Sequence, residues 1–281
     1  MVLQKEKMNK EMLLIIGPCA AESPEQIETT ILEAQRRGIS HIRASLWKPR
    51  TRPGGFEGLG LKGLGLLEMI ADHGLTPATE VISPQDAEAV VNNIVGKKGK
   101  RVLIWTGART GVGLIIKAIA KTIEGEPRAG IMVKNPMEQD TAHWMGMMEY
   151  AAEGCQNPAQ IWMCHRGFWQ ENGPLRNPPD INMALCIREN LRQRLGVVVP
   201  LIFDPSHVSG RSDSIKRVTK ETIRKGRHDL NGGVNGLIIE VHPNPAEALT
   251  DRAQQLSWFQ FDNLAVRVPG IYQNLAVTLT V

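Results

Sequence analysis

The sequence predicts a (β/α)8 TIM barrel, and three of its features lead to this fold class. Short apolar runs alternate with longer amphipathic runs along the chain, and eight such pairs follow one another. Several of the short runs are apolar at almost every position, as expected for parallel strands buried on both faces. The chain has 281 residues, close to the length of about 250 residues that is typical of this barrel. Eight strand–helix units in series favour a closed parallel sheet.

The eight predicted strands are short and end at polar residues. The clearest continuous apolar run lies in Val197–Phe203, with a second at Leu237–Ile239. Both have the length and composition of a buried strand rather than of an amphipathic helix. In chain order, the predicted strands are Leu13–Ile16, His41–Arg43, Thr76–Val81, Arg101–Trp105, Gly130–Val133, Ala159–Met163, Val197–Phe203 and Val234–Glu240.

A predicted helix follows each strand. Ser23 and Ser83 stand where an N-cap is needed, and Glu25 falls in the first turn of the first helix. An open, doubly wound sheet is the structural alternative, but no Gly-x-Gly-x-x-Gly motif follows the first strand, which argues against a dinucleotide-binding fold. The predicted helices are Ser23–Arg37, Gly60–His73, Ser83–Asn93, Val112–Ile123, Asp140–Glu153, Met183–Leu195, Ser212–Lys225 and Pro245–Leu256.

The chain divides into three segments of very different length. Residues 1–11 form a polar N-terminal lead-in, residues 12–256 form the catalytic barrel, and residues 257–281 form a C-terminal tail. Leu264–Val268 and Leu275–Val281 have extended, apolar character. We therefore expect the tail to pack against the barrel or against a second subunit.

Composition excludes several classes of protein. Apolar residues make up 42% and charged residues 22% of the chain, as in ordinary globular domains. No apolar run approaches the roughly 20 residues that cross a membrane, and Met12–Ile16 is too short for the core of a signal peptide. In a chain of this length, the four cysteines do not form a disulfide scaffold. We therefore expect a cytoplasmic protein. The cysteines are Cys19, Cys155, Cys164 and Cys186.

The charge balance is mildly basic. A formal net charge of +4 suits anionic substrates, although many proteins without such substrates share it. The densest basic stretches, residues 97–101 and 216–227, contain no aromatic residues between the charges. This pattern is typical of a solvated loop and a solvated helix face, so we expect no nucleic-acid partner.

Polar groups that can bind or catalyse follow every predicted strand. Catalytic residues of this barrel gather at the C-terminal ends of its strands. Ordinary turns would mostly place Gly, Asn or Ser there, so the whole set is a stronger signal than any single member. The segments are Gly17-Pro18-Cys19, Arg43 with Lys48-Pro49-Arg50-Thr51, Thr79-Glu80, Gly107-Ala108-Arg109-Thr110, Lys134-Asn135-Pro136, Cys164-His165-Arg166-Gly167, Asp204-Pro205-Ser206-His207 and Glu240-Val241-His242.

One group of these residues offers sulfur, nitrogen and oxygen donors. Cys19, His207 and Glu240 follow the first, seventh and eighth strands, with Asp251 as a further carboxylate. Strand eight is the neighbour of strands one and seven in a closed barrel, so the group can converge. Such donors suit a borderline divalent ion such as Mn²⁺, Fe²⁺, Co²⁺ or Zn²⁺. Taken alone, Cys19 is better explained as a small buried residue and His207 as a turn or core histidine.

The second group is cationic. Six positive side chains at the mouth of one barrel need anions to offset them. Two phosphates and a carboxylate would match, because Arg binds such groups with a planar fork and Lys acts as a point charge. The members are Arg43, Lys48, Arg50, Arg109, Lys134 and Arg166.

These motifs resemble those of 3-deoxy-D-arabino-heptulosonate 7-phosphate (DAHP) synthases, in the short type I group related to 3-deoxy-D-manno-octulosonate 8-phosphate synthase. The resemblance runs from about Leu13 to Leu256. It rests on Gly17-Pro18-Cys19-Ala20-Ala21-Glu22-Ser23, Lys48-Pro49-Arg50-Thr51, Thr79-Glu80-Val81, Gly107-Ala108-Arg109, Lys134-Asn135-Pro136, His165-Arg166-Gly167-Phe168, Asp204-Pro205-Ser206-His207 and Glu240-Val241-His242-Pro243.

The resemblance implies a role for each site residue. It implies an enzyme of the shikimate pathway that condenses phosphoenolpyruvate with erythrose 4-phosphate, the aldehyde being held by Arg50 and Thr51. Lys48 would donate a proton or stabilise the developing alkoxide, and Glu80 would orient water. It also implies metal ligands at Cys19, His207, Glu240 and Asp251, and phosphoenolpyruvate contacts at Arg43, Lys48, Glu80, Arg109, Lys134 and Arg166.

Two alternatives stay open. Octulosonate synthases use arabinose 5-phosphate, but they differ at the Lys48–Thr51 motif, and their metal-independent forms have Asn where this chain has Cys19. A catalytically silent barrel that regulates a chorismate mutase is the second alternative. The Lys-Asn-Pro and His-Arg-Gly-Phe motifs resemble a subgroup in which a chorismate mutase domain often follows the barrel, so a separate chorismate mutase is a candidate partner. We also expect a homo-oligomer, either a dimer or a tetramer.

Overall fold

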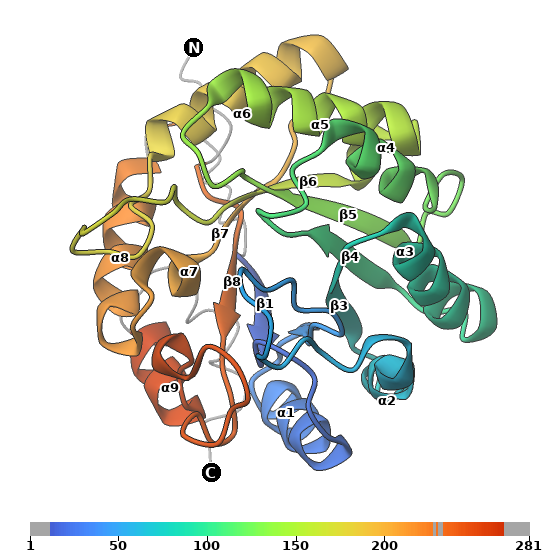
Figure 1. Cartoon of the computed structure of the whole chain (residues 1–281), viewed down its shortest axis with the longest axis vertical. Helices are drawn as coiled ribbons and strands as arrows, with labels where there is room; N and C mark the ends of the chain where they lie inside the picture. Colours follow the sequence, from blue (N-terminus) through green and yellow to red (C-terminus); the bar gives the residue numbers. More distant parts are fainter. Residues whose placement is uncertain (1–11, 227–228, 230–232, 267–281) are drawn as a thin grey trace, which may run out of the picture.

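Parallel strands close a barrel in the chain order β1 to β8, which confirms the predicted fold class. The structure, a computed structural model, describes residues 12–226, 229 and 233–266. Figure 1 shows the strands at the centre and the helices around them. The strands are β1 (Leu13–Gly17), β2 (His41–Arg43), β3 (Thr76–Val81), β4 (Val102–Thr106), β5 (Ala129–Lys134), β6 (Ile161–His165), β7 (Leu201–Phe203) and β8 (Gly236–Glu240).

Local signals in the sequence fix where several helices begin. The hydroxyl oxygens of Ser23 and Ser83 accept hydrogen bonds from the Gln26 and Asp86 amides at 3.2 Å, which confirms both predicted caps. The helices are α1 (Pro24–Arg36), α2 (Leu64–Asp72), α3 (Pro84–Val91), α4 (Gly113–Lys121), α5 (Thr141–Cys155), α6 (Ile181–Leu195), α7 (Pro205–Ser209), α8 (Ser212–Gly226) and α9 (Trp258–Ala265), with short turns η1 (Gly60–Gly63), η2 (Asn92–Lys97), η3 (Pro158–Gln160) and η4 (Arg252–Gln254).

Two apolar clusters hold the barrel together. The larger lies between the strands and the surrounding helices. The smaller fills the barrel interior and consists of Ile15, Ala78, Leu103, Trp105, Met132, Cys164, Ile202 and Ile238. Trp105 is fully buried, and the Arg43 guanidinium and the Lys134 ammonium lie 5.4 and 5.3 Å from its ring centroid. This aromatic face therefore lies beneath the cations of the barrel mouth and can attract both.

The predicted helix over Pro245–Leu256 is wrong. After β8 the chain forms irregular turns and the short η4, and Asp251 adopts a left-handed φ of 51° that a continuous helix does not allow. The last helix begins later, at α9. Its first turn is fixed by a capping box, in which Ser257 accepts from the Gln260 amide and the Gln260 side chain accepts from the Ser257 amide. The segment between β8 and α9 forms no α-helix and carries Asp251 back over the barrel mouth.

The predicted tail also differs from expectation in its described part. Leu264 and Ala265 lie in α9, not in extended chain. Trp258 and Phe261 of this helix join the larger apolar cluster, and Arg37 of the α1 C-cap forms an ion pair with Asp262 at 2.7 Å. This part of the tail therefore packs against the barrel. Residues 267–281 and the lead-in of residues 1–11 lie outside the described residues.

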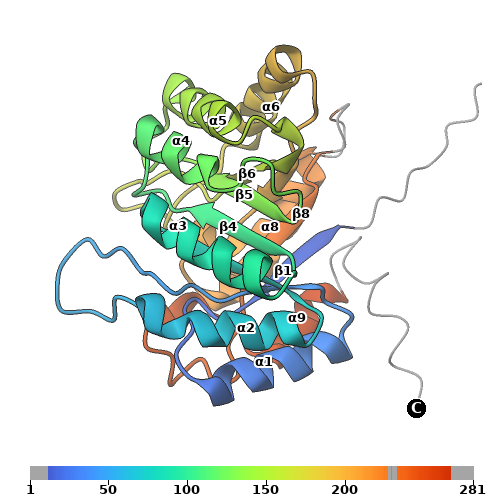
Figure 2. The same cartoon turned by 90° about the vertical axis from the view of Figure 1, so that its right-hand side faces the viewer.

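One loop of the fold bears directly on the site. The loop between β2 and η1 projects beyond the C-terminal ends of the strands (Figure 2), so residues Lys48–Thr51 can reach over the barrel mouth.

The predicted strands Ala159–Met163, Val197–Phe203 and Val234–Glu240 begin later than expected, at Ile161, Leu201 and Gly236. Within residues 12–226, 229 and 233–266, no helix has both the length and the apolar character that a membrane span requires.

Candidate active site

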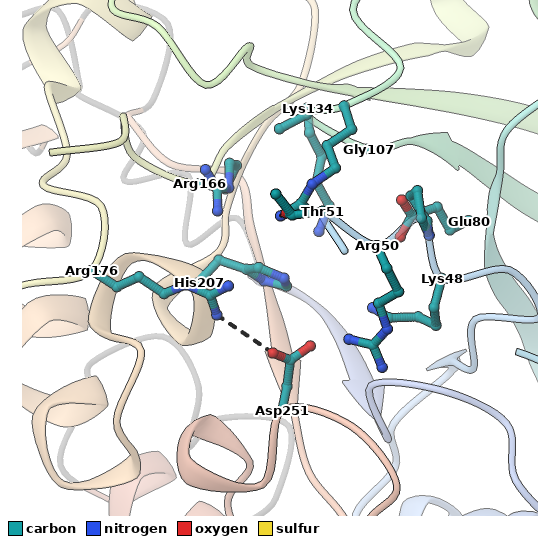
Figure 3. A pocket seen from close by; sticks show the side chains of 13 residues that line it. Lys48, Arg50, Thr51, Glu80, Gly107, Lys134, Arg166, Arg176, His207 and Asp251 are labelled. Atoms are coloured by element: carbon teal, nitrogen blue, oxygen red, sulfur yellow. Dashed lines mark hydrogen bonds and ion pairs between the residues drawn. The ribbon is translucent and has the colours of Figure 1, made fainter. Parts of the chain in front are cut away.

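The C-terminal mouth of the barrel holds a polar cavity of about 210 Å³. Most of the predicted site residues point into it, as Figure 3 shows. Its walls come from the ends of strands and the loops that follow them, which is where this barrel places its chemistry. The lining residues are Lys48, Pro49, Arg50, Thr51, Glu80, Gly107, Ala108, Arg109, Lys134, Arg166, Arg176, His207 and Asp251.

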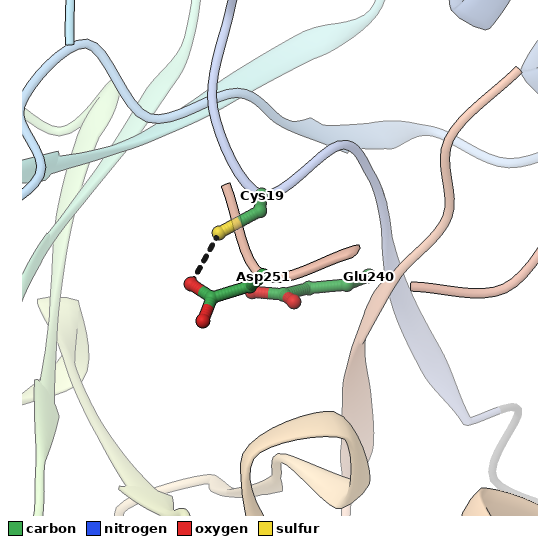
Figure 4. Close-up of side chains that lie close together, drawn as sticks. All are labelled: Cys19, Glu240 and Asp251. Atoms are coloured by element: carbon green, nitrogen blue, oxygen red, sulfur yellow. Dashed lines mark hydrogen bonds between the residues drawn. The ribbon is translucent and has the colours of Figure 1, made fainter. Parts of the chain in front are cut away.

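Three of the four predicted metal ligands meet at the edge of this cavity (Figure 4). One ligand atom each of Cys19, Glu240 and Asp251 lies within 4.8 Å of the others. The pairing of β1 with β8 aligns Gly17 with Glu240, which puts Cys19 just beyond the end of the same strand pair. The Cys19 thiol donates a hydrogen bond to Asp251 Oδ2 at 3.2 Å. The closing of the barrel therefore brings together residues from the two ends of the chain.

The fourth predicted ligand, His207, lies beside this group but outside it. Its Nε2 atom is 3.8 Å from Glu240 Oε1, and its Nδ1 atom is 2.8 Å from Asp204 Oδ2. His207 belongs to α7, a short helix that the sequence did not reveal, and Asp204 caps that helix by accepting from the His207 amide at 3.1 Å. Burial lowers the pKa of His207 despite the opposing charge of Asp204. The imidazole is therefore neutral at physiological pH, the form that ligates metals.

Charge around the three clustered ligands fits a bound cation. Burial and then Glu240 raise the pKa of Cys19 well above its usual value. Burial alone would raise the pKa of Glu240, but the charge of Arg43 opposes it, and the pKa is lowered. The site thus holds ionised carboxylates beside a thiol that keeps its proton. A divalent ion would favour the thiolate, because a cation at the sulfur stabilises its negative charge.

Arg43 is held beneath the cavity by Glu240. It is 1% exposed, its Nη2 atom bonds to Glu240 Oε1 at 2.9 Å, and it is absent from the cavity lining. Its Nη1 atom is buried and has no hydrogen-bond partner among the described residues. A buried guanidinium with an unused donor is costly unless an anion or water meets it. Arg43 therefore positions Glu240 and retains one donor for a bound group.

The other predicted cations line the cavity. Lys134 forms an ion pair with Asp204 at 2.8 Å, and Arg109 donates to Thr51 Oγ1 at 2.8 Å. Arg50 donates from Nε to the Phe56 carbonyl oxygen at 2.8 Å, which orients its fork. The Arg109–Thr51 hydrogen bond therefore links a residue expected to contact phosphoenolpyruvate to one expected to hold the aldehyde.

Two buried cations show how strongly the site is charged. Burial lowers the pKa of Arg166 to about 10, and nearby Arg176 and Arg109 add to the shift while Asp204 opposes it. Burial would also lower the pKa of Lys48, but the carboxylates of Glu80, Glu240 and Asp251 oppose it, and the pKa is raised. Lys48 therefore keeps its proton. Anions in the cavity would relieve the repulsion among the arginines.

Sequence reasoning did not identify several residues that build the site. Asp204 is fully buried between Lys134 and His207, and its position in the Asp-Pro-Ser-His motif was the available signal. Arg176 lines the cavity beside Asp251 but stands ten residues after Arg166, outside the strand-end motif. Nothing in its local pattern distinguishes it from a loop arginine.

The sequence matches the family described as the DAHP synthetase I family over residues 5–272. The chain belongs to this family. Its match to the phospho-2-dehydro-3-deoxyheptonate aldolase of Thermotoga maritima is 28% identical and covers 96% of this chain and 72% of that protein. The 2-dehydro-3-deoxyphosphooctonate aldolase of Acidithiobacillus ferrooxidans is also 28% identical, over 85% of this chain and 81% of its own length.

Solved structures agree with the assignment to the DAHP synthetase I family. The crystal structure of the Thermotoga maritima DAHP synthase superposes with a TM-score of 0.77 at 28% identity, over 96% of this chain and 72% of that one. A truncated form of the 3-deoxy-D-arabino-heptulosonate 7-phosphate synthase of Thermotoga maritima gives a TM-score of 0.74 at 26% identity, over 96% and 89%. Family membership confirms the predicted resemblance and identifies the chain as an enzyme of this family.

Proposed function

We propose that this chain condenses phosphoenolpyruvate with D-erythrose 4-phosphate and water to give DAHP and inorganic phosphate, the first step of the shikimate pathway. The observation that carries the proposal is the cavity itself, in which Arg109, Lys134 and Arg166 lie beside the group of Cys19, Glu240 and Asp251. Such a site suits two phosphorylated substrates next to a divalent ion. Membership in the DAHP synthetase I family supports the same reaction.

The two substrates would divide the cations between them. We assign the phosphoenolpyruvate anion to Arg109, Lys134 and Arg166, with the unused Nη1 donor of Arg43 as a further contact from below. Arg50 and Thr51 then hold the aldehyde phosphate. The hydrogen bond from Arg109 to Thr51 places the two anion sites side by side. This arrangement would orient the reacting carbons toward one another, which is a large part of catalysis for a two-substrate reaction.

We propose that Cys19, His207, Glu240 and Asp251 hold the divalent ion, one of Mn²⁺, Fe²⁺, Co²⁺ or Zn²⁺. Their sulfur, nitrogen and oxygen donors are the set that such borderline ions prefer. When bound, the ion supplies a Lewis acid that polarises the aldehyde carbonyl. His207 is the proposed fourth ligand because its Nε2 atom lies 3.8 Å from Glu240 Oε1.

The chain's own residues move the protons. Carbon C3 of phosphoenolpyruvate forms a bond to the aldehyde carbon, and the aldehyde oxygen takes a proton, which we assign to Lys48 because its ammonium is protonated and lines the cavity. Water adds at C2 as positive charge develops there. The C2–O bond then breaks, its electron pair leaves with phosphate, and the new hydroxyl at C2 gives its proton to the departing phosphate as the ketone of DAHP forms. Glu80, buried at the cavity wall, orients the water and accepts its proton.

An octulosonate synthase that uses arabinose 5-phosphate is the alternative function. The observation in its favour is the 28% identity to an octulosonate aldolase of Acidithiobacillus ferrooxidans, equal to that of the heptonate aldolase of Thermotoga maritima. Against it stands the Lys48-Pro49-Arg50-Thr51 motif, of which every residue lines the cavity. The alternatives therefore differ at the aldehyde end of the site and not at the phosphoenolpyruvate end.

The deciding experiment offers both aldehydes to the full chain with phosphoenolpyruvate and measures phosphate release with and without EDTA. We expect rapid turnover with erythrose 4-phosphate, slow turnover with arabinose 5-phosphate, and loss of both after chelation. In water enriched in ¹⁸O, the released phosphate should carry no label, because the C–O bond breaks. Preference for the pentose would contradict the proposal, and no consumption of phosphoenolpyruvate with either aldehyde would favour a silent barrel.

Three further parts of the proposal concern context. We propose residues 12–256 as the catalytic barrel, followed by a tail over residues 257–281. We propose a homo-oligomer, either a dimer or a tetramer, with a separate chorismate mutase as a candidate partner. All four cysteines are free, which fits a reducing compartment such as the cytoplasm. Light scattering and co-purification with a chorismate mutase would test the assembly.

A further inference from the structure

Arg176 lies at the edge of the cavity where the metal-ligand group and the substrate cations meet (Figure 3). Its Nη1 atom donates to Gln254 Oε1 at 2.7 Å and lies 3.5 Å from Asp251 Oδ1. The Arg176 side chain is 43% exposed, so its ion pair with Asp251 alone would contribute little. Gln254 is buried, and the bond to it is the stronger and better shielded contact.

Gln254 links Arg176 to a second carboxylate, that of Glu240. Its Nε2 atom donates to Glu240 Oε2 at 2.7 Å. Arg176 offers only donors and ionised Glu240 offers only acceptors, so a single orientation of the Gln254 amide satisfies both. Arg176 thereby fixes the direction in which Gln254 presents its N–H group. Without Arg176, the amide oxygen would lose its partner, and the amide could turn away from Glu240.

The neighbouring residue holds the third member of the group. Gln255 Oε1 accepts from the Cys19 amide at 3.0 Å, and its Nε2 atom donates to the Thr250 carbonyl oxygen at 2.8 Å. Gln254 ends η4 and Gln255 follows it directly. The segment from Asp251 to Gln255 therefore contacts both Glu240 and Cys19. A displacement of Gln254 would shift all three proposed ligands.

The backbone around Arg176 is fixed against α7. The Asn177 amide donates to the Val208 carbonyl oxygen at 3.1 Å, and the Asn177 side chain donates to the His207 carbonyl oxygen at 2.6 Å. Gly210 has a φ of +69°, and a Cβ atom there would lie 2.6 Å from Arg176 Cβ. Because Gly210 has no Cβ atom, the Arg176 side chain can pack closely against it. The loop conformation therefore keeps this arginine in place.

We infer that Arg176 is a positioning residue for the divalent-ion site, acting through Gln254 on Glu240. The inference rests on the proposed function, since it assigns a task toward the ion that Cys19, Glu240 and Asp251 would hold. Groups that orient metal ligands typically change metal affinity by about 10- to 100-fold when they are removed. Arg176 thus belongs to the ion site rather than to the sugar phosphate.

The test measures ion binding without turnover. Co²⁺ is titrated into the purified full chain after dialysis against EDTA, and the thiolate-to-cobalt absorption band reports its binding at Cys19. We expect Arg176→Met to weaken Co²⁺ binding about 10- to 100-fold, and Arg176→Lys to recover part of the loss. Gln254→Ala should weaken binding too, and the double variant should bind no more weakly than Gln254→Ala, because the two residues act in series.

Arg211→Met is the matched control. It removes the same charge two residues beyond Ser209, where the Arg211 side chain is 72% exposed and pairs with Asp213. It should bind Co²⁺ like the parent chain. Unchanged Co²⁺ binding by Arg176→Met, with a raised KM for erythrose 4-phosphate, would overturn the inference and make Arg176 a substrate contact. Additive losses in the double variant would also overturn it. A parent chain that fails to bind Co²⁺ would instead refute the proposed metal site, and the inference with it.

Discussion

The Cys19 sulfur lies 3.2 Å from Asp251 Oδ2, although 232 residues separate the two in the sequence. Cys19 follows β1, and Asp251 lies in the irregular segment after β8, so only closure of the barrel makes them neighbours. The thiol keeps its proton because burial raises its pKa. A divalent ion bound here would displace that proton and gain a thiolate ligand, which makes this contact central to the predictions below.

Replacing Cys19 should remove ion binding and turnover together. We expect Cys19→Ala to reduce Co²⁺ affinity by at least about 100-fold, since one of four proposed ligands is lost, and to abolish phosphoenolpyruvate consumption. Equilibrium dialysis with metal analysis measures the first, and phosphate release measures the second. The exposed Cys186 is the matched control, and Cys186→Ala should behave like the parent. Full turnover by Cys19→Ala in the presence of EDTA would refute the metal mechanism.

Arg109 should affect substrate binding without affecting stability. Among the described residues, its side chain donates one hydrogen bond, to Thr51, and the charged contact to phosphoenolpyruvate would be worth about 1.5–3 kcal/mol. We therefore expect Arg109→Met to raise the KM for phosphoenolpyruvate about 10- to 100-fold, with the free energy of unfolding changed by less than about 0.5 kcal/mol. Steady-state kinetics and urea denaturation measure the two effects.

The control for Arg109 is Arg36→Met. The Arg36 side chain is 74% exposed and pairs with Glu33 on α1, away from the cavity. It should leave KM and stability as they are. An Arg109→Met enzyme with normal KM would exclude Arg109 from the phosphoenolpyruvate site.

Replacing Gly107 should displace Glu80 and so test the role of Glu80 in turnover. A Cβ atom at Gly107 would lie 2.1 Å from Glu80 Oε1, so Gly107→Ala must push the Glu80 carboxylate out of place. We expect kcat to fall by about 10-fold or more, the scale of a misplaced acid–base group, while Co²⁺ binding is retained. Pre-steady-state phosphate release would locate the slow step.

Gly65→Ala is the matched control for Gly107→Ala. Gly65 lies in α2, and a Cβ atom there meets nothing within 4 Å. This substitution should stabilise the protein by about 0.5–1 kcal/mol, because Ala loses less conformational entropy on folding than Gly, and should leave kcat unchanged. Equal kcat values for both variants would remove Glu80 from the proposed mechanism.

Acid should destabilise the fold through His165. Burial lowers the pKa of this histidine from its usual 6.5 to about 3, with Asp180 opposing the shift. Its Nε2 atom accepts from the Asp180 amide at 2.9 Å, which requires the unprotonated nitrogen. Because the folded pKa lies below the unfolded one, the unfolded chain gains the proton first. Stability is therefore fully present above about pH 6.5 and is lost as the pH falls toward 3.

The expected size of this effect is about 2 kcal/mol lost between pH 7 and pH 5 for His165 alone. Urea denaturation at the two pH values measures it. His165→Gln, which cannot titrate and retains an acceptor, should reduce the slope, whereas His73→Gln at an exposed position should not. His41 adds a smaller part, since burial and Arg101 lower its pKa to about 4. An unchanged slope in His165→Gln would show that other groups control acid unfolding.

The sequence by itself determined the fold class and most of the residues around the cavity. Buried strands have apolar runs, helices have caps such as Ser23 and Ser83, and the C-terminal ends of barrel strands carry function. These are local signals, so they could be read without knowing which strands pair. They identified Lys48, Lys134 and the other cations before any distance was known.

The tertiary structure decided what local patterns cannot encode. Pairing of β1 with β8 places Cys19 beside Glu240, and the left-handed turn at Asp251 replaced an expected helix and brought that carboxylate back to Cys19. The ion pair of Arg43 with Glu240, which holds Arg43 beneath the cavity, also joins residues far apart in the chain. Arg176 stands in no sequence motif that would mark it as a site residue. Contacts between residues far apart in the chain depend on how the barrel closes, and closure is a property of all the strands together.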